Sequence, residues 1–569
     1  INSQEKIQTR AGYSIYGAAG SGTNPVESSY DWSHSKNGVI SLRAYGSTLQ
    51  AYFGTVGGIV VDAWTNIGEG ITFSAVDFSF APWWDTTEDL DFLLIVNGAD
   101  QIYDWTGAVA TLASATSTTI TKNGTATWAQ ERFLVSAATK RVYINGTLYT
   151  YTGGTGTTTL TGVTPNPSSE AVNSVVYQEI RTNDNEPVDA AVNDFIKVID
   201  NQLWIGSNSG SEVYVSKNTD FKDFSFSTPR VSGEGALLVL DSVCRAFAKQ
   251  RDKIAISAGR DDWYVNEFEQ ITVSTTLAET LKIRKLKTGV GSAARHHDLV
   301  TEVGDLIAFI DFNNQLRLLG DIENLENPYL QTLSDSIKPT FDAEDFTNGH
   351  IKSHRNRIYI ACPQNSRVYI NEVRQTETGE LARFWQPPQI LPIRRFAVIG
   401  DLIYGHSSGF NETYKLFDGT DDNDKPIAFN ASFAYRNYGD RAIQKILDEV
   451  LVEGYISGNA ELKLTVNYDF DGSTAQRETL IKGSDSSILF QPLAGGGLGE
   501  EGIGTSPIGD QPLGSTTNPK FRVIKEFPPQ DFFEVQFVFS SSGQDDQWEV
   551  ICHGANARMS PNQNTSIKQ

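Results

Sequence analysis

The hydrophobic positions along the chain repeat one pattern: a short apolar run, a turn of Gly, Asn or Ser, and a second apolar run carrying an aromatic residue. The clearest copy covers residues 201–215, where the turn lies at Asn208-Ser209-Gly210. Two apolar runs around such a turn predict a β-hairpin. Further copies cover residues 93–105, 253–265, 357–370 and 401–416, with weaker ones at 47–53 and 305–318. The chain is therefore predicted to be built from repeated hairpins.

The spacing of the hairpins predicts a β-propeller. One apolar position per copy gives intervals of 45, 109, 51, 52, 52 and 45 residues between Leu49, Leu94, Leu203, Ile254, Leu306, Ile358 and Ile403. A period of about 40 to 50 residues built from hairpins is typical of propeller blades, each a four-stranded sheet packed on its neighbours. We predict an all-β fold with a propeller of six or seven blades. A solenoid of hairpins is the alternative, but the chain lacks its shorter and stricter period.

The doubled interval predicts a small β module inserted at residues 113–182. This insertion holds a hairpin that turns at Asn145-Gly146, the strongest short turn signal, followed by a Gly/Thr-rich stretch. Its length suits a contact surface on the rim of a larger assembly, and an insertion without a role of its own is the alternative. The first blades would occupy residues 1–112, with residues 7–13 closing the ring against the last blade, and the remaining blades residues 183–417.

Residues 418–426 predict a linker between domains, because they are polar and end on Pro426. Beyond them, residues 427–569 contain longer strands that mostly alternate apolar and polar positions, which predicts a C-terminal β-sandwich. The four carboxylates between Asp418 and Asp424 suggest calcium, but Gly419 stands second and not sixth, where the sharp turn of a calcium loop needs it. A solvated linker is the favoured interpretation.

A glycine-rich loop at residues 495–517 interrupts the predicted sandwich, and it is too long for an ordinary connection in a compact domain. Such a loop either stays disordered or is ordered by a partner; we favour the partner and predict that the loop forms a gate or a subunit contact. Its glycines are Gly495, Gly496, Gly497, Gly499, Gly502, Gly504, Gly509 and Gly514. Deleting the loop without any effect on assembly, DNA retention and infectivity would contradict this hypothesis.

Composition and charge narrow the function classes. The 569 residues are 39% hydrophobic and carry a formal net charge of -23. This negative charge argues against binding of nucleic acid through counterion release. An acidic surface can still line a passage through which DNA slides, although acidity alone also keeps a large β protein soluble.

Cys244, Cys362 and Cys552 are widely spaced and odd in number, which predicts neither a disulfide framework nor a zinc site and fits synthesis in a reducing compartment. The chain has no signal sequence, initiator Met or apolar stretch of about 20 residues, so we expect no stable membrane insertion and a start inside the gene product.

No motif indicates an enzyme. His296-His297-Asp298 resembles part of a metal or catalytic set, but neighbours on a strand face opposite ways and no third partner is apparent. The acidic residues Asp85, Glu88, Asp89 and Asp91 suggest paired glycosidase carboxylates, yet an acidic turn needs no function. Phosphate-binding loops, nucleophile elbows and HExxH are missing from the sequence. We therefore predict no catalysis, no cofactor and no metal.

The chain resembles the tail nozzle proteins of short-tailed bacteriophages, also called tail stabilisation or tail tube B proteins. The likeness rests on QTRAGY at 8–13, on the inserted ING at 144–146 with LTGV at 160–163, and above all on YKLFDGTD at 414–421. The last motif continues through Tyr438-Gly439-Asp440 to KIL at 445–447, as a last propeller strand runs into the next β domain of such proteins. The resemblance spans most of the chain, although each motif alone is loose.

The resemblance implies a homo-oligomeric ring, a hexamer, in the tail of a virion made in the host cytoplasm. Such a ring joins the tail adaptor and portal, contacts tail fibres, and forms the distal conduit that DNA crosses into the host without tight binding. The alternative is a tail-associated propeller that binds a receptor or glycan, because ten Trp and 21 Tyr could stack on sugars. Trp204, Trp263, Tyr264 and Tyr369 lie on the hairpin repeats and are predicted to be blade core. A propeller hydrolase would need repeated carboxylates on inner strands, which the sequence lacks.

Overall fold

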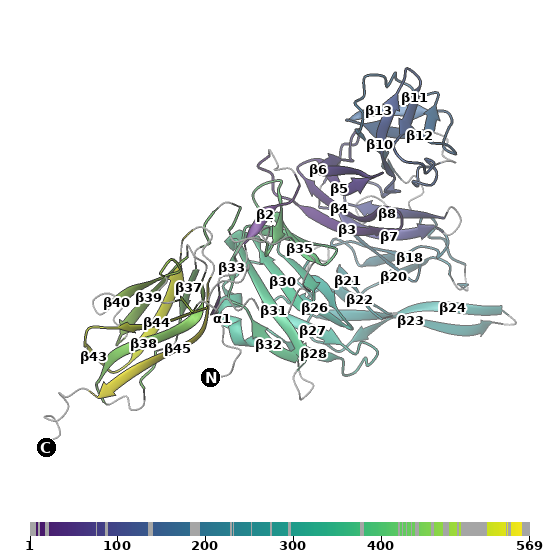
Figure 1. Cartoon of the computed structure of the whole chain (residues 1–569). Helices are drawn as coiled ribbons and strands as arrows, with labels where there is room; N and C mark the ends of the chain where they lie inside the picture. The colour runs from purple at the N-terminus through teal and green to yellow at the C-terminus, as the bar shows by residue number, and fades with distance from the viewer. Residues whose placement is uncertain are drawn as a thin grey trace, which may run out of the picture. The chain divides into compact units, whose positions relative to one another are not determined.

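The computed structural model describes most of the chain as two compact units (Figure 1). One unit is Ile15–Tyr414, and the other combines Ile1–Ser14 with Lys415–Gln569. The described residues are 7–8, 12–17, 22–75, 77–85, 89–134, 140–182, 194–227, 230–231, 233–251, 253–273, 276–293, 298–375, 381–418, 421–423, 425–427, 429–433, 435–438, 443–456, 460–469, 477–485, 489–490, 520–541, 543 and 548–559.

The larger unit is a β-propeller of seven blades, each a sheet of four main antiparallel strands. Listed from the innermost strand outward, blade 1 is β3 (Ser28–His34), β4 (Gly38–Tyr45), β5 (Thr48–Val56) and β6 (Ile59–Asn66); blade 2 is β7 (Ser79–Asp85), β8 (Leu90–Val96), β9 (Tyr103–Trp105) and β16 (Arg181–Thr182); blade 3 is β17 (Phe195–Ile199), β18 (Gln202–Gly206), β19 (Glu212–Val215) and β20 (Ala236–Val239); blade 4 is β21 (Cys244–Gln250), β22 (Lys253–Ala258), β23 (Asp262–Val273) and β24 (Thr276–Leu286); blade 5 is β25 (Val300–Val303), β26 (Leu306–Ile310), β27 (Leu316–Gly320) and β28 (Tyr329–Thr332); blade 6 is β29 (His350–His354), β30 (Arg357–Cys362), β31 (Arg367–Gln375) and β32 (Leu381–Trp385), with β33 (Gln389–Ile390) beside β31; blade 7 is β34 (Ile393–Ile399), β35 (Leu402–Ser407), β36 (Thr413–Leu416) and β2 (Tyr13–Ile15). The predicted propeller is thus confirmed, with the upper of the two predicted blade numbers.

The innermost strands form a closed ring. Each of β3, β7, β17, β21, β25 and β29 contacts the innermost strand of the following blade, and β34 contacts β3. Blade 7 combines strands from both ends of the propeller sequence, because β2 supplies the outermost strand of this blade. We predicted that residues 7–13 close the ring; the closing strand is instead Tyr13–Ile15, while β1 (Ile7–Gln8) pairs with β45 (Trp548–Met559). One N-terminal segment therefore supplies strands to two sheets.

The predicted hairpins are the second and third strands of the blades, except that residues 47–53 fall on the third strand alone. These strands are covered on both faces by the neighbouring blades, so they need continuous apolar runs. In β18, for example, all five residues are buried. The outermost strands are more exposed and vary more in length, from the two residues of β16 to the eleven of β24. This explains why the sequence pattern shows the middle of each blade best.

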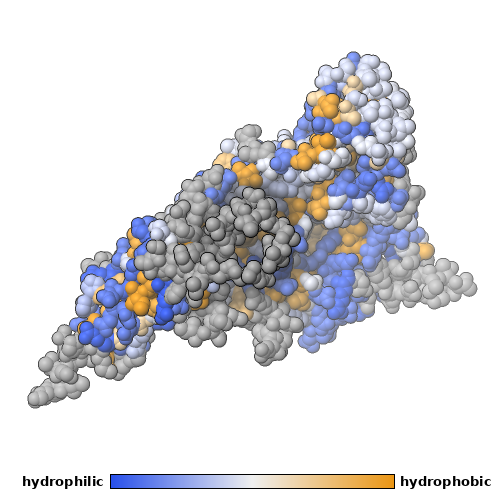
Figure 2. All heavy atoms as spheres, in the orientation of Figure 1, coloured by the Kyte–Doolittle hydropathy of each residue, from blue (hydrophilic) through white to orange (hydrophobic). Residues whose placement is uncertain are grey.

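The inserted module interrupts blade 2 between β9 and β16. It is a six-stranded sheet of β10 (Val109–Ala115), β11 (Thr119–Lys122), β12 (Lys140–Ile144), β13 (Thr147–Tyr151), β14 (Thr159–Thr161) and β15 (Val175–Gln178). The module has its own core around Trp128 and Phe133, and Asn145 takes the positive φ that the predicted turn requires. Figure 2 shows its surface as mostly pale, as expected for its Thr, Ser and Gly residues. The strands begin at Val109, four residues before the predicted insertion.

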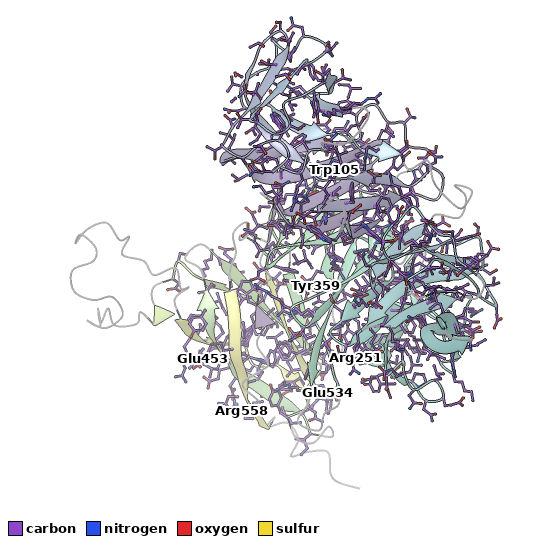
Figure 3. All side chains as sticks on the ribbon, turned by 90° about the vertical axis from the view of Figure 1, so that its right-hand side faces the viewer. Trp105, Arg251, Tyr359, Glu453, Glu534 and Arg558 are labelled. Atoms are coloured by element: carbon purple, nitrogen blue, oxygen red, sulfur yellow. The ribbon has the colours of Figure 1, made fainter. Side chains whose placement is uncertain are left out.

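The smaller unit is the predicted β-sandwich. One sheet has the order β1, β45, β38 (Lys445–Ile456), β42 (Lys520–Glu526) and β41 (Leu489–Phe490), with β43 (Asp531–Phe532) beside β38. The other has the order β37 (Phe429–Ser432), β44 (Val535–Ser541), β39 (Glu461–Tyr468) and β40 (Arg477–Lys482). One core fills the space between them, with Val450, Leu464 and Phe537 among its buried residues. Polar residues such as Glu453 and Arg558, labelled in Figure 3, belong to the strands β38 and β45 of the first sheet.

Helix is scarce in the described part of the chain, which holds one short α-helix, α1 (Lys338–Asp342), and no helix long and apolar enough to cross a membrane. Residues 278–283, for which the sequence favours strand over helix, lie in β24. The hairpin of β23 and β24 extends well beyond the other strands of its blade (Figure 1).

Removing the side chain of Trp263 is expected to destabilise the propeller. Trp263 is fully buried on β23, and its ring lies 5.1 Å from that of Phe309 in blade 5, so it bridges two blades. Trp263→Ala should cost about 3 to 5 kcal/mol, through lost apolar burial and the cavity left behind. Urea unfolding followed by tryptophan fluorescence measures this. Val60→Ala, at a side chain that is 75% exposed, should change stability by less than about 0.5 kcal/mol. Equal effects of the two substitutions would contradict this account.

Candidate functional site

The N-terminal segment and the predicted linker form one junction inside the smaller unit. The Tyr13 N–H donates to the Asp421 carbonyl at 3.0 Å, the Asp418 N–H to the Gly12 carbonyl at 2.9 Å, and the Asn423 N–H to the Tyr13 carbonyl at 2.8 Å. Tyr13 and Asp422 accordingly form a parallel bridge. Two stretches some 400 positions apart in sequence are thus joined through their backbones.

Gly12 is required at this junction. A Cβ built on Gly12 would lie 1.6 Å from the Asp421 carbonyl oxygen, far inside the contact distance of two atoms. Only a residue without a side chain lets the two backbones approach so closely. The need for a glycine at position 12 cannot be predicted from the sequence, because Asp421, the residue that it contacts, lies at the far end of the propeller sequence.

The carboxylates of the predicted linker are engaged by this junction. Asp418 accepts a hydrogen bond from the Ser14 hydroxyl at 3.1 Å and pairs with Lys415 at 3.0 Å. The unit boundary lies at Tyr414/Lys415, before the predicted linker at 418–426, and the residues after it pair with the N-terminal segment. Among the described residues, no group of three His, Cys, Asp or Glu is arranged to hold a metal ion.

The centre of the propeller ring is crossed by ionic contacts. Arg395 on β34 is only 3% exposed and reaches Asp298 of blade 5 at 2.7 Å and Asp77, which precedes blade 2, at 3.7 Å. Its guanidinium also donates to the Asn348 and Gly349 carbonyls before blade 6, at 3.1 and 3.3 Å. One arginine therefore ties together four of the seven blades.

Further contacts bring in the remaining blades. Lys197 of blade 3 pairs with Glu302 of blade 5, and Glu302 also accepts the Lys249 N–H of blade 4 at 2.6 Å. Asp31 of blade 1 accepts from the Ser41 hydroxyl at 3.0 Å and from the Val398 N–H of blade 7. We name these residues the ring-centre contacts: Asp31, Asp77, Lys197, Lys249, Asp298, Glu302 and Arg395. All seven blades meet through polar groups at the middle of the ring.

Burial sets the charge of this region. It raises the pKa of Asp298 to about 8, an effect that Arg395 opposes, and it raises the pKa of Asp31 to about 6 against the opposing charge of Lys352. Burial likewise lowers the pKa of Arg394, which pairs with Glu27. Burial therefore favours the neutral form of both acids, while Arg395 and Lys352 favour their charged form.

The other residues that the sequence analysis considered for metal binding or catalysis have different surroundings in the structure. Asp298 joins the ring-centre contacts, while His296 and His297 lie outside the described residues, as does Glu88. Asp89 pairs with Arg132 at 3.5 Å, and Asp91 accepts the Ser35 N–H at 3.0 Å. The two carboxylates thus hold different neighbours.

An open pocket lies where the inserted module meets blade 1, lined by Lys36, Thr125, Ala126, Gln130 and Arg132. Its cations are already paired, Lys36 with Glu131 at 3.8 Å and Arg132 with Asp89. The pocket therefore offers little net charge to a ligand.

The aromatic residues of the repeats are blade core, as predicted. Trp204, Trp263, Tyr264 and Tyr369 are all buried, and are thus withdrawn from stacking on a sugar. Cys244 and Cys362 are buried free thiols. The glycines proposed for a gate or subunit contact, from Gly495 to Gly514, lie outside the described residues.

Comparison with known proteins gives only remote likenesses. No family model matches the chain. No curated protein matches it either. Among solved structures, Hsv2 of Kluyveromyces lactis is 10% identical with a TM-score of 0.25, covering 65% of this chain and 100% of its own. BBS1N, solved in complex with ARL6DN and soaked with lead, is 10% identical with a TM-score of 0.32, covering 72% of this chain and 98% of its own. Likenesses at these scores carry no conclusion about function.

Gly12→Ala is expected to open the junction. The new Cβ forces the backbones apart, so the amides of Tyr13, Asp418 and Asn423 should exchange with deuterium at least about tenfold faster, as their hydrogen bonds are lost. Hydrogen–deuterium exchange with mass spectrometry measures this. Gly409→Ala is the control, because a Cβ there meets nothing within 4 Å. Unchanged protection in Gly12→Ala would contradict the role of Gly12.

Asp298→Asn is expected to flatten the pH dependence of stability. With a folded-state pKa raised to about 8, folded Asp298 keeps a proton that the unfolded chain loses above about pH 4. The stability of the wild type should therefore fall, relative to Asp298→Asn, by up to about 1.4 kcal/mol per pH unit between about pH 5 and pH 7. Urea unfolding at several pH values tests this, with the exposed Asp305→Asn as control. Parallel pH profiles of wild type and Asp298→Asn would show that Asp298 is ionised throughout.

Proposed function

We propose that this protein is the tail nozzle of a short-tailed bacteriophage, a structural virion protein without enzymatic activity. In this role, copies of the chain form a closed ring of six in the virion tail. The ring is attached to the tail adaptor and portal, borders tail fibres, and forms the distal conduit for genome retention and ejection.

The junction at Gly12 and Asp421 is the observation that carries the proposal. The sequence motifs that most resemble such proteins, at residues 8–13 and 414–421, meet there through backbone hydrogen bonds. Motifs at opposite ends of the propeller sequence that meet in one contact are constrained together by the fold. They support the resemblance as a single structural feature and not as separate coincidences.

The ring-centre contacts bear on where DNA would pass. A duplex is about 20 Å wide, and its grooves alone are about 12 and 6 Å wide. Arg395 and Lys197 span the propeller ring to acids of other blades, so side chains occupy its middle. The conduit in this proposal is therefore the hole enclosed by several subunits. A net charge of -23 on each subunit would repel DNA phosphates from its wall and let the duplex slide.

The purified protein is expected to assemble into a closed ring with a central hole, alone or after mixing with the portal and adaptor of the virion. Light scattering and negative-stain class averages measure its mass and symmetry. The protein should bind duplex DNA only weakly, with a dissociation constant above about 100 µM at physiological salt, because like charges oppose contact.

Two outcomes would contradict the proposal. Tight DNA binding at ordinary salt would conflict with a sliding passage. A persistent monomer or trimer that ignores the portal would favour the alternative of a receptor- or glycan-binding tail protein, which a glycan array would then test.

A further inference from the structure

Two arginines of the propeller converge on one exposed aromatic ring. The guanidinium carbons of Arg245 and Arg260 lie 5.9 and 5.8 Å from the ring centre of Phe312. Arg245 is the second residue of β21, the innermost strand of blade 4. Arg260 lies in the turn between β22 and β23, and Phe312 in the turn between β26 and β27 of blade 5. Phe312 is 37% exposed. We name these three residues the arginine clamp.

The arginine clamp lacks a counter-charge. Neither Arg245 nor Arg260 takes part in an ion pair with any described residue, and Nε of Arg245 is buried without a hydrogen-bond partner. Two other cations of blade 4 are paired: Arg251 with Asp305 at 3.6 Å, and Lys285 with Asp262 at 2.7 Å. A buried guanidinium donor left unmatched is costly, so a carboxylate from outside would be favoured at this site.

One stretch of the chain, in blades 1 and 2, carries the opposite charge alone. From residue 44 to residue 121 the chain has nine carboxylates and no Lys or Arg. Three of these acids are held by neutral donors: Asp62 by the Tyr52 hydroxyl at 2.8 Å, Glu69 by the Asn66 amide at 2.6 Å, and Asp100 by the Ser74 N–H at 2.8 Å. None of the three forms an ion pair with a described residue. We name Asp62, Glu69 and Asp100 the acidic triplet.

The arginine clamp and two of the three acids, Glu69 and Asp100, lie at one face of the ring but in different blades, while Asp62 lies within β6. In an antiparallel four-stranded blade, the turn between the second and third strands and the start of the innermost strand lie at the same end. The arginine clamp occupies these positions in blades 4 and 5. Asp100 lies in the second turn of blade 2, and Glu69 in the connection from blade 1 to blade 2. Two blades, 3 and 4, separate Asp100 in blade 2 from Phe312 in blade 5.

We propose that the arginine clamp of one copy of the chain docks onto the acidic triplet of the next copy. This proposal rests on the proposed function in one respect: the contact would be the interface between neighbouring copies in a ring. Two different patches on one subunit make a heterologous, head-to-tail contact, which closes into a ring when its rotation allows. Phe312 adds apolar burial between the two guanidinium groups, as an aromatic anchor does at many interfaces.

Charge reversal with exchange between subunits tests this pairing. One variant is R245E/R260E and the other is D62K/E69K/D100K, both made in the full chain. Each variant alone faces like charges across the contact, so its association constant should fall at least about tenfold below that of wild type. In an equimolar mixture each reversed patch meets its opposite charge, and association should return to within about threefold of wild type. Analytical ultracentrifugation and negative-stain images measure both.

Controls separate docking from folding and from the proposed function. R251E changes an exposed arginine of the same blade, labelled in Figure 3, and should leave association unchanged. R245Q/R260Q removes charge without reversing it and should weaken association less than R245E/R260E, with the same thermal midpoint as wild type. The proposal is overturned by a wild type that stays monomeric at about 100 µM and low salt, or by reversed variants that associate as wild type does. Rings that form on the portal and adaptor despite both reversals would keep the nozzle function and reject this interface.

Discussion

The propeller depends on the closure of its ring between blade 7 and blade 1. Every blade buries both faces only if it has a neighbour on each side, so an open ring would expose two apolar sheet faces. The chain meets this requirement by taking the outermost strand of the last blade, β2, from its own beginning. Polar contacts cross this seam beside aromatic ones such as Trp64 with His406. Buried Arg43 of blade 1 donates to the Thr413 hydroxyl of blade 7 at 3.0 Å and lies 4.1 Å from the ring centre of Trp64.

Polar closure has a physical consequence for specificity. Burying an arginine costs free energy unless its donors are satisfied, so Arg43 is well accommodated only when blade 7 stands beside blade 1 with Thr413 in place. Apolar faces alone would pack on several partners. The same logic holds at the ring centre, where Arg395 finds Asp298 and two backbone carbonyls only in a ring with the right number of blades. Hydrophobic packing thus stabilises the blades, while buried ionic groups select the closed arrangement.

This division explains what the sequence can predict. The middle strands of each blade are continuous apolar runs, so the hairpin at residues 201–215 and its copies are visible as a period. The outer strands β16 and β2 have two and three residues, too short to show a pattern, which is why the blade number stayed at six or seven. The ring-centre contacts join residues such as Asp77 and Arg395, which are remote in sequence and share no spacing. Asp298 attracted attention beside His296-His297 for a catalytic reason, whereas its structural partner is an arginine almost 100 positions away.

Electrostatics raises a further constraint for any assembly of this chain. Copies that each carry -23 repel one another, yet at physiological salt the repulsion decays over about 8 Å, so it acts mainly between facing surfaces. Contacts at hydrogen-bond distance are screened far less than charges across the particle. Local regions where the sign is reversed and unpaired therefore favour the attachment of like-charged subunits. Many of the described cations form internal ion pairs, as with Lys197, Lys285 and Arg395. Arginines without an internal partner are therefore the groups through which an acidic protein of this kind can attract its own copies, while its remaining surface keeps DNA and other polyanions at a distance.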